Sequence, residues 1–275
     1  MSIRIAAGIV CFNPDIDRLE KNISSIKSQV EQVIIYDNGS NNIGDIADLC
    51  SNMILESSDR NMGIAYALNS IMGIAENEGY DYVITLDQDS IAPSDLVKIL
   101  SELVNDRTAI VCPTIWDINK KENPELVNTY ELVDRCITSG SLTSVKSWKT
   151  IGGFDERMFI DGVDFDFCDR LRKKNYEIVQ SKRIALIHEI GHRTNKRFLF
   201  WNISVKNHSA FRKYYIAKNI VYLDRKNQHK GYPIKTLLRE CKQVLLVVLY
   251  EDDKKSKVRN LIRGMIDGFA EEITR

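Results

Sequence analysis

A repeated alternation of strand-like and helix-like segments dominates the first 113 residues. Continuous apolar runs occupy residues 5–12, 33–36, 53–55, 82–86 and 109–112, and helical spacing of apolar residues occupies residues 19–26, 43–49, 64–75 and 93–104. Strands that are apolar throughout are typical of parallel sheets covered by helices on both faces. The pattern therefore predicts an α/β fold with a central mixed, mostly parallel sheet flanked by helices.

Polar, turn-forming residues follow each of the first four predicted strands. Asn13 and Pro14 follow the first strand, residues 37–40 the second, residues 58–63 the third and residues 87–90 the fourth. Right-handed crossovers place the carboxyl ends of parallel strands along one edge, where open α/β sheets bind ligands. The four polar segments therefore predict a ligand cleft at this edge.

The fourth of these segments contains two carboxylates one residue apart, Asp87 and Asp89. Side chains i and i+2 of an extended chain point the same way, so both can reach one cation. Mg²⁺ and Mn²⁺ prefer oxygen ligands, and Mg²⁺ typically combines one or two carboxylates with substrate phosphates. A plain turn before a helix capped by Ser90 or Ser94 is the alternative. The place at a predicted ligand edge favours the metal.

Composition narrows the class of protein. The 275 residues fit one large domain or one domain with an appendage, and the formal net charge of zero gives no global field that attracts nucleic acid. Six scattered cysteines without a CxxC pair predict reduced, buried thiols in a cytoplasmic protein rather than disulfides or a zinc site. No signal-peptide pattern opens the sequence, and the longest apolar run, residues 244–250, is too short to span a bilayer.

The alternation stops after residue 113. A strand is expected over residues 127–133 and a helix over residues 162–174, the latter after an acidic loop. Beyond residue 207 the pattern is helical, over residues 210–222, 234–250 and 258–272. This helical tail is the best candidate for a separate region.

Eight short motifs together resemble one enzyme family. In chain order they are IVCFNP (9–14), IIYDNGS (34–40), NMGIAYALN (61–69), LDQDS (86–90), ITSGSL (137–142), GGFDERMFIDGVDFDFCDRL (152–171), HEIG (188–191) and NHSAFRKYYIAKN (207–219). They resemble the inverting family-2 glycosyltransferases of the glycosyltransferase-A fold, most closely the bacterial rhamnosyltransferase-like branch. The resemblance implies a catalytic domain over residues 1–205, made of a nucleotide-sugar half (1–113) and an acceptor half (114–205), and a helical region over residues 206–275.

The same resemblance implies a role for each matching residue. Asp37 would accept a hydrogen bond from the imide N–H of uracil or thymine, which cytosine lacks. Further donor contacts would come from Asn13, Pro14, Asn38, Asn61, Gly63, Asp87 and Gln88. The metal ligands would be Asp87, Asp89 and His188, and the acceptor contacts Ser139, Gly140 and Asp161. Purely structural roles remain open for several: a turn for Asp37, a helix cap for Asn61, a turn for Gly63 and a structural imidazole for His188.

The catalytic base implied by the resemblance is Asp164. An inverting transferase needs a base that takes the proton of the attacking acceptor hydroxyl. Many relatives carry a Glu-Asp pair at this helix start, whereas here the residue before Asp164 is Val163. Its acidic neighbours have structural interpretations: Asp161 as a helix cap, Asp166 in a surface pair with Arg170 at i+4, and Asp169 facing solvent.

The implied function is transfer of a sugar, L-rhamnose from dTDP-L-rhamnose first among the candidates, with Mn²⁺ or Mg²⁺. The acceptor would be a lipid-linked or oligosaccharide glycan in bacterial surface polysaccharide synthesis, such as O-antigen or capsule. UDP-hexose and galactofuranose donors remain open. A sugar-nucleotide nucleotidyltransferase would open with a glycine-rich basic loop, which residues 11–14 are not. A non-catalytic carbohydrate-binding domain is disfavoured because it would not need Asp37, Asp87, Asp89 and Asp164 together.

The helical tail combines apolar and basic residues. Apolar pairs and runs stand at residues 237–238, 244–249 and 261–262, with lysines and arginines between them. A basic amphipathic segment can lie on anionic lipid, which predicts peripheral contact with the inner face of the cell membrane. Packing on the catalytic domain and homodimerisation are the alternatives.

Overall fold

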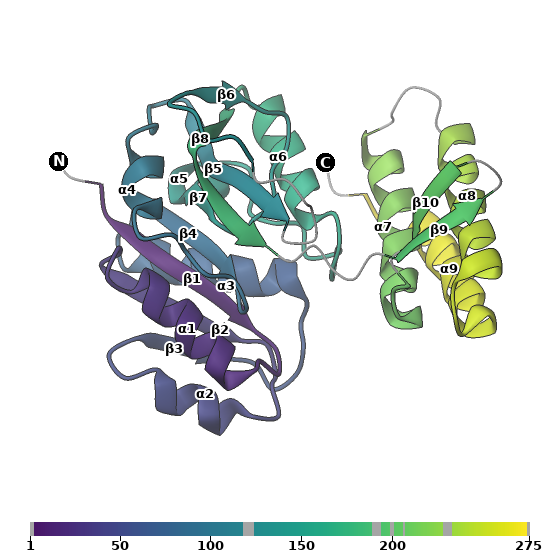
Figure 1. Cartoon of the computed structure of the whole chain (residues 1–275), viewed down its shortest axis with the longest axis horizontal. Helices are drawn as coiled ribbons and strands as arrows, with labels where there is room; N and C mark the ends of the chain where they lie inside the picture. The colour runs from purple at the N-terminus through teal and green to yellow at the C-terminus, as the bar shows by residue number, and fades with distance from the viewer. Residues whose placement is uncertain are drawn as a thin grey trace. The chain divides into compact units, whose positions relative to one another are not determined.

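The computed structural model describes residues 3–117, 124–188, 194–198, 201–205, 207–227 and 233–273. It comprises two compact units, drawn in Figure 1. The first unit is Met1–Phe159 with Val163–Glu189, and the second is Ile160–Gly162 with Ile190–Arg275. The division of the contacts falls near residue 190, and the boundary at residue 205 stays a prediction.

An eight-stranded sheet forms the centre of the first unit, with strand order β3-β2-β1-β4-β7-β5-β8-β6. The strands are β1 (Ile5–Cys11), β2 (Gln32–Asp37), β3 (Ile54–Ser57), β4 (Tyr82–Asp87), β5 (Thr108–Asp117), β6 (Tyr130–Leu132), β7 (Ser141–Ser144) and β8 (Glu177–His188). β7 runs antiparallel to β4 and β5, β6 runs antiparallel to β8, and the remaining neighbours are parallel. The predicted mixed, mostly parallel sheet is confirmed.

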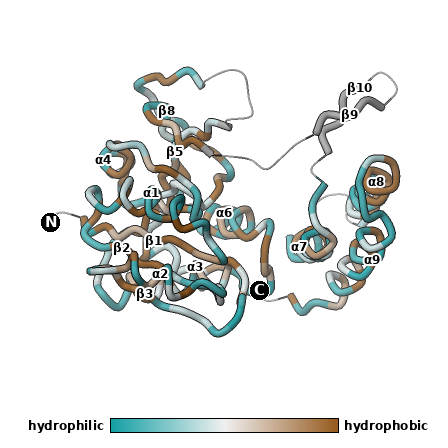
Figure 2. The backbone as a smooth tube through the Cα atoms, turned by 60° about the horizontal axis from the view of Figure 1, so that its bottom comes forward, coloured by the Kyte–Doolittle hydropathy of each residue, from teal (hydrophilic) through white to brown (hydrophobic). Residues whose placement is uncertain are grey.

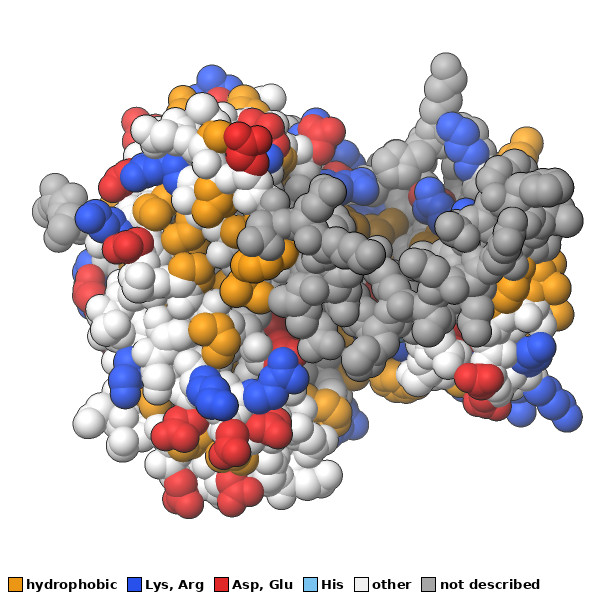
Figure 3. All heavy atoms as spheres, viewed as in Figure 1, with side chains coloured by type: hydrophobic (Ala, Val, Ile, Leu, Met, Phe, Trp, Pro, Cys, Tyr) orange, Lys and Arg blue, Asp and Glu red, His pale blue; other side chains and the backbone are white. Residues whose placement is uncertain are grey.

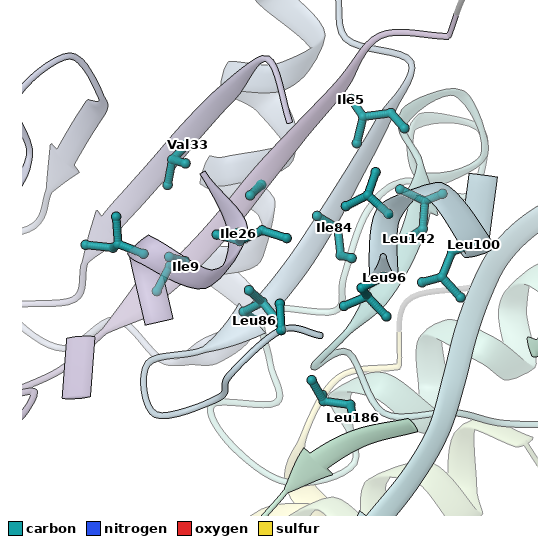
Figure 4. Packing of buried hydrophobic residues seen from close by; sticks show 14 of the residues in the cluster. Ile5, Ile9, Ile26, Val33, Ile84, Leu86, Leu96, Leu100, Leu142 and Leu186 are labelled. Carbon is teal, nitrogen blue, oxygen red and sulfur yellow. The ribbon is translucent and has the colours of Figure 1, made fainter. Parts of the chain in front are cut away.

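Helices cover both faces of this sheet: α1 (Ile16–Ile26), α2 (Ile43–Leu49), α3 (Ile64–Asn77), α4 (Leu96–Ser101), α5 (Val145–Thr150) and α6 (Val163–Lys173). The apolar sides of α1, α2 and α4 share one core with the strands, in which Ile9, Ile26, Ile84 and Leu96 are buried. Figure 4 shows these side chains packed together. On the other face, α3 approaches β1 closely at Gly8, where a Cβ would lie 2.5 Å from Ile71 Cγ2.

Strand register brings the predicted polar segments to one edge. Cys11 pairs with Asp37, Asp37 with Ser57, and Val10 with Asp87. On the far side of β7, Asp117 pairs with His188 at the carboxyl ends of β5 and β8, which run in the same direction as β4. The sheet therefore presents one continuous carboxyl edge.

The second unit contains the hairpin β9 (Thr194–Phe198) and β10 (Trp201–Val205) and the helices α7 (Ala210–Asn227), α8 (Ile234–Tyr250) and α9 (Lys254–Ala270). α7 and α9 pack closely through two glycines: a Cβ on Gly264 would overlap the carbonyl oxygen of Tyr214, and one on Gly268 would lie 2.5 Å from that of Lys218. None of the helices within the described ranges is long and apolar enough to cross a membrane.

Candidate active site

Asp37, the last residue of β2, has one carboxylate oxygen available for a ligand. The residue is 1% exposed, and its Oδ2 accepts a hydrogen bond from Ser40 N at 3.0 Å. Its Oδ1 is buried and has no hydrogen-bond partner within the described part of the chain. A buried acceptor left unpaired is costly, so this oxygen suits an incoming N–H group. The local turn bond and a ligand bond are compatible because they use different oxygens.

The first polar loop is tied to the loop after β2. Asn13 has a φ of 46°, its N–H donates to Ser40 Oγ at 2.7 Å, and its Oδ1 accepts from Asn41 N at 2.8 Å. The carbonyl of Pro14 accepts from Asn42 Nδ2 at 3.0 Å. Asn13 and Pro14 therefore fix the two loops beside Asp37, and direct contact with a nucleotide stays a prediction for both.

Asn38 and Asn61 hold the loop that leads into α3. The buried Asn38 accepts from Met62 N at 2.8 Å and donates to Gly63 O at 3.2 Å, and Asn61 Oδ1 accepts from Gly63 N at 2.9 Å. Gly63, not Asn61, is the cap of α3, and with a φ of 91° a Cβ there would lie 2.7 Å from Phe159 O. The close approach at Gly63 is thus to the chain's own backbone.

The acidic end of β4 is held by backbone contacts. Asp87 O accepts from Asn22 Nδ2 at 2.6 Å, and Asp87 N donates to Ser139 Oγ at 3.1 Å. Gln88 Oε1 accepts from Phe12 N at 2.8 Å, which ties this loop to the end of β1. The amide of Gln88, predicted to touch the donor, is therefore engaged with the backbone, and the buried Asn22 is a supporting residue that no motif signalled.

Asp89 lies at the surface of this loop. Its side chain is 43% exposed, and Oδ2 lies 3.9 Å from the guanidinium of Arg18. Asp87 and Asp89 can supply two carboxylates to a cation, and the described residues contain no group of three or more potential ligands. Two carboxylates completed by substrate phosphate are a donor set that fits Mg²⁺ or Mn²⁺.

His188 ends β8 at the same edge of the sheet. The neighbouring Ile187 forms a backbone bridge with Ile91, two residues after Asp89, so the backbone of β8 reaches the acidic loop. The imidazole of His188 and residues 189–191 of its motif lie outside what the structure describes. Its role as a metal ligand stays a prediction.

Ser139 and Gly140 attach a second loop to the acidic edge. Ser139 Oγ lies 2.9 Å from Ser90 Oγ, in addition to its bond with Asp87 N, and Gly140 N donates to Thr85 O at 2.7 Å. Gly140 has a φ of 76°, and a Cβ there would lie 2.8 Å from Leu186 Cδ2. The two predicted acceptor residues thus join the start of β7 to the end of β4.

A cavity of ≈ 200 Å³ lies beside Ser139 in the first unit. Its walls come from β5, the 135–141 loop, the first turn of α6 and β8, and include Arg135, Phe165 and Gln180. The guanidinium carbon of Arg135 lies 5.5 Å from the ring centroid of Phe165. None of these three residues belongs to the predicted site, because each comes from a separate element and only the fold brings them together.

The acidic residues of α6 occupy different environments. Asp164, in the first turn, is partly buried, and its Oδ1 accepts from Phe165 N at 2.9 Å. Asp166 is only 2% exposed, and its Oδ2 accepts from Arg170 Nε at 2.6 Å, so the expected surface pair is instead a buried one. Asp169 does not face solvent as expected: its side chain is 14% exposed and accepts two bonds from Arg135, at 2.9 and 2.6 Å.

Asp161 is held within the second unit. Its φ is 68°, and both carboxylate oxygens accept from Arg212, at 2.9 and 2.7 Å. Arg212 thus engages both oxygens of the side chain, and the role of Asp161 as a helix cap stays a prediction. Binding of an acceptor by Asp161 stays a prediction.

Most of the thiols are buried, as expected: Cys11, Cys50, Cys112 and Cys168 are buried, whereas Cys136 is partly exposed and Cys241 exposed. Burial raises the pKa of the Cys11 thiol, and the adjacent Asp37 carboxylate raises that pKa further. Cys11 therefore remains a neutral thiol next to the Asp37 carboxylate, the candidate ligand of the nucleobase.

Comparison with known proteins gives the family. Residues 7–211 match the model of Glycosyl transferase family 2. The chain is a family-2 glycosyltransferase. This membership supports glycosyl transfer over the two alternative functions, nucleotidyl transfer and non-catalytic carbohydrate binding.

Individual relatives agree with the family. The glycosyltransferase is 29% identical to dTDP-rhamnosyl transferase RfbF of Shigella flexneri, over 98% of this chain and 96% of the relative. It is also similar in structure to GalNAc-T7, solved with UDP, GalNAc and Mn²⁺, at a TM-score of 0.61 and 14% identity, and to S. aureus TarS 1-349, at 0.55 and 10%. Each of the two structural matches covers 98% of this chain. They cover 56% of the GalNAc-T7 chain, just over half its length, and 72% of the TarS chain. The two structures support the predicted glycosyltransferase-A fold.

Proposed function

We propose that this glycosyltransferase transfers a sugar, L-rhamnose from dTDP-L-rhamnose in the first instance, with inversion, onto a glycan of bacterial surface polysaccharide. The observation that carries the donor class is the buried Oδ1 of Asp37 at the carboxyl edge of the sheet, which has no hydrogen-bond partner among the residues that the structure describes. A carboxylate accepts the imide N–H of thymine or uracil and finds no such donor in cytosine. The full-length similarity to a dTDP-rhamnosyl transferase supports thymine and rhamnose.

The diphosphate would lie against Asp87 and Asp89. A divalent cation, Mn²⁺ or Mg²⁺, would neutralise the leaving diphosphate when bound there. The hydrogen bonds from Asn22 to Asp87 O and from Asp87 N to Ser139 hold this strand end in place. The chain's own contribution is therefore a held backbone at Asp87, with the exposed carboxylate of Asp89 two residues further along the loop.

The acceptor would enter the cavity lined by Arg135 and Phe165, beside Ser139. An aromatic ring and a guanidinium suit the apolar face and the hydroxyls of a sugar. Asp164, next to Phe165, would take the proton as the acceptor oxygen bonds to the anomeric carbon and the bond from that carbon to the diphosphate breaks. One displacement of this kind inverts the anomeric centre.

A second donor class, UDP-hexose or UDP-galactofuranose, fits Asp37 equally well because uracil presents the same imide. The acceptor would be lipid-linked or an oligosaccharide, and a lipid-linked acceptor would call for an enzyme in the cytoplasm at the inner face of the membrane. Packing on the catalytic domain and homodimerisation remain the alternative uses of the C-terminal helices.

A thermal-shift screen of dTDP, UDP, CDP and GDP with Mn²⁺ tests the donor assignment. A ligand bound only by the folded state raises stability by RT ln(1 + [L]/Kd), about 2.7 kcal/mol at a hundredfold excess over Kd. We expect shifts with dTDP or UDP and none with CDP or GDP, and loss of the shift in Asp37→Ala. A shift with CDP as large as that with dTDP contradicts the assignment.

A further inference from the structure

α8 presents an apolar face to solvent in the second unit. Its large exposed side chains have 45–69% of their surface accessible and are Ile234, Leu237, Leu238, Leu245, Val248 and Leu249. With 3.6 residues per turn they fall within one sector of about 120°. Figure 2 colours much of α8 as hydrophobic, and Figure 3 shows hydrophobic side chains along the outer edge of the second unit where Figure 1 draws this helix. We call these six residues the α8 face.

The helix packs by its other side. Thr236, Glu240 and Val247 are buried, and Val247 shares a small core with Ala217 of α7 and Leu261 of α9. The α8 face is therefore not the surface through which α8 joins its own unit. It is exposed in the second unit.

The exposed charges of α8 have one sign. Lys235, Arg239 and Lys242 are exposed, and Glu240, the acidic residue of Ile234–Tyr250, is buried. On the helix surface the three basic residues follow one another along one border of the α8 face, over about 60°. Apolar residues bordered by cations match the boundary between the acyl chains and the headgroups of an anionic bilayer.

A second copy of the chain matches this surface less well. An antiparallel two-fold contact between α8 faces would bring the same border of both helices together. Lys242, at the middle of Ile234–Tyr250, would then lie beside Lys242 of the second copy, and α8 offers no exposed carboxylate to pair with them. Like charges placed together at an interface disfavour association.

We infer that the α8 face binds the surface of an anionic lipid bilayer, with its apolar residues at the acyl boundary and Lys235 and Lys242 at the lipid phosphates. The inference uses the second unit alone and does not depend on which sugar is transferred. It deepens the proposed function by naming the surface that would hold the enzyme where a lipid-linked acceptor resides.

Co-sedimentation of the full chain with vesicles tests this binding. The protein should sediment with phosphatidylcholine vesicles containing phosphatidylglycerol and much less with phosphatidylcholine alone, and added salt should weaken binding. Leu238→Glu with Leu245→Glu should weaken partitioning by about tenfold or more. Lys235→Gln with Lys242→Gln should weaken it by about thirtyfold on anionic vesicles only.

Leu132→Glu is the matched control. Leu132 lies in β6 of the first unit and is 64% exposed, against 65% for Leu238. The substitution therefore removes an equally exposed leucine from another part of the chain. It should leave vesicle binding unchanged. All variants should keep the unfolding temperature and the dTDP- or UDP-induced shift of the parent, because the substituted side chains face solvent.

Three results would overturn the inference: no sedimentation of the parent with anionic vesicles, equal loss in Leu132→Glu, or a dimer that Leu238→Glu with Leu245→Glu dissociates without any vesicle binding. The last result would assign the α8 face to a second copy. Failure of nucleotide binding with vesicle binding retained would instead count against the proposed function and leave the inference standing.

Discussion

The backbone N–H of Asp87 donates a hydrogen bond to Ser139 Oγ across 3.1 Å. Asp87 ends β4, and Ser139 belongs to the loop that enters β7, so one hydroxyl joins the acidic edge to the wall of the Arg135 cavity. Ser139 also lies 2.9 Å from Ser90 Oγ. Donor and acceptor regions of the proposed site are thus positioned by the same side chain.

Ser139→Ala should therefore impair transfer more than stability. Loss of two hydrogen bonds costs about 1 kcal/mol each, whereas a displaced reacting group can cost about a hundredfold in rate. We expect a small fall in unfolding temperature and a transfer rate reduced by about ten- to hundredfold. Ser101→Ala, whose hydroxyl bonds to Lys98 O at the end of α4, should leave the rate unchanged.

Asp164→Asn should abolish proton removal while preserving donor binding. Losing a general base lowers the rate by roughly 10²–10⁴-fold. Nucleotide affinity, measured by thermal shift, should stay near that of the parent. Asp17→Asn, an exposed acid in the first turn of α1, controls for a lost carboxylate at a helix start and should remain active.

Two neighbours of Asp164 give different outcomes. Asp166→Asn breaks a buried pair with Arg170 and should lower the free energy of unfolding by about 3 kcal/mol. Asp169→Asn frees Arg135 in the cavity wall and should alter the KM for acceptor more than kcat. If Asp164→Asn is fully active, the catalytic base is a carboxylate other than Asp164.

Asp89→Asn should weaken the metal-dependent part of nucleotide binding. The shift produced by dTDP or UDP with Mn²⁺ should fall towards the value seen with EDTA. Asp95→Asn, at the start of α4 and without a side-chain capping bond, should behave as the parent does. Binding and transfer that survive EDTA in the parent would remove the metal from the mechanism.

Substitution by alanine should have opposite effects at two glycines that lie in different surroundings, one in the α7–α9 contact and one in α3. Gly268→Ala forces a methyl group against the backbone of α7 and should destabilise the second unit by about 1–3 kcal/mol. Gly73→Ala, in α3 with nothing within 4 Å, should stabilise the first unit by about 0.5–1 kcal/mol. Denaturant unfolding followed by circular dichroism measures both.

The buried carboxyl of Glu240 should make the protein less stable as the pH rises. Burial raises the pKa of this carboxyl from 4.5 to about 7, with a smaller raising contribution from Asp224, while Arg239 and Lys213 lower it. Between these values the unfolded chain releases the proton that the folded chain keeps, so the free energy of unfolding decreases with pH, by up to about 3 kcal/mol. Glu240→Gln should remove this decrease and should be as stable as the parent at pH 5. Thermal unfolding of both proteins at pH 5 and pH 8 measures the difference.

The parallel half of the sheet and its polar edge could be predicted because each strand is a continuous apolar run followed by turn residues. The bounds of α2 and α8 agree with the predicted ranges. β7 was not predicted: Ser141–Ser144 is short and mostly hydroxylic, yet all four residues are buried because the strand lies between β4 and β5. The hairpin β9–β10 likewise gave no clear pattern.

The site was predicted where one motif supplies neighbouring residues and missed where tertiary structure joins distant ones. Asp37 and Asp87 follow directly from strand ends. The pairing of Arg135 with Asp169, 34 positions apart, and of Asn22 with Asp87, 65 apart, leaves no local signature. Asp169 was expected to face solvent because helical spacing alone does not reveal a partner from another loop.

The direction of β7 has a consequence for how this enzyme can diversify. Because β7 runs against its neighbours, its first residue, Ser141, pairs with Thr85 near the carboxyl end of β4, and the preceding loop arrives at the ligand edge without a crossover helix. Ser139 and Gly140 of this loop are buried, whereas Asp134 and Arg135 before them are exposed. If the Arg135 cavity takes the acceptor, we expect that exchanging residues 134–138 while keeping Ser139 would change the acceptor preference and leave the nucleotide preference unchanged.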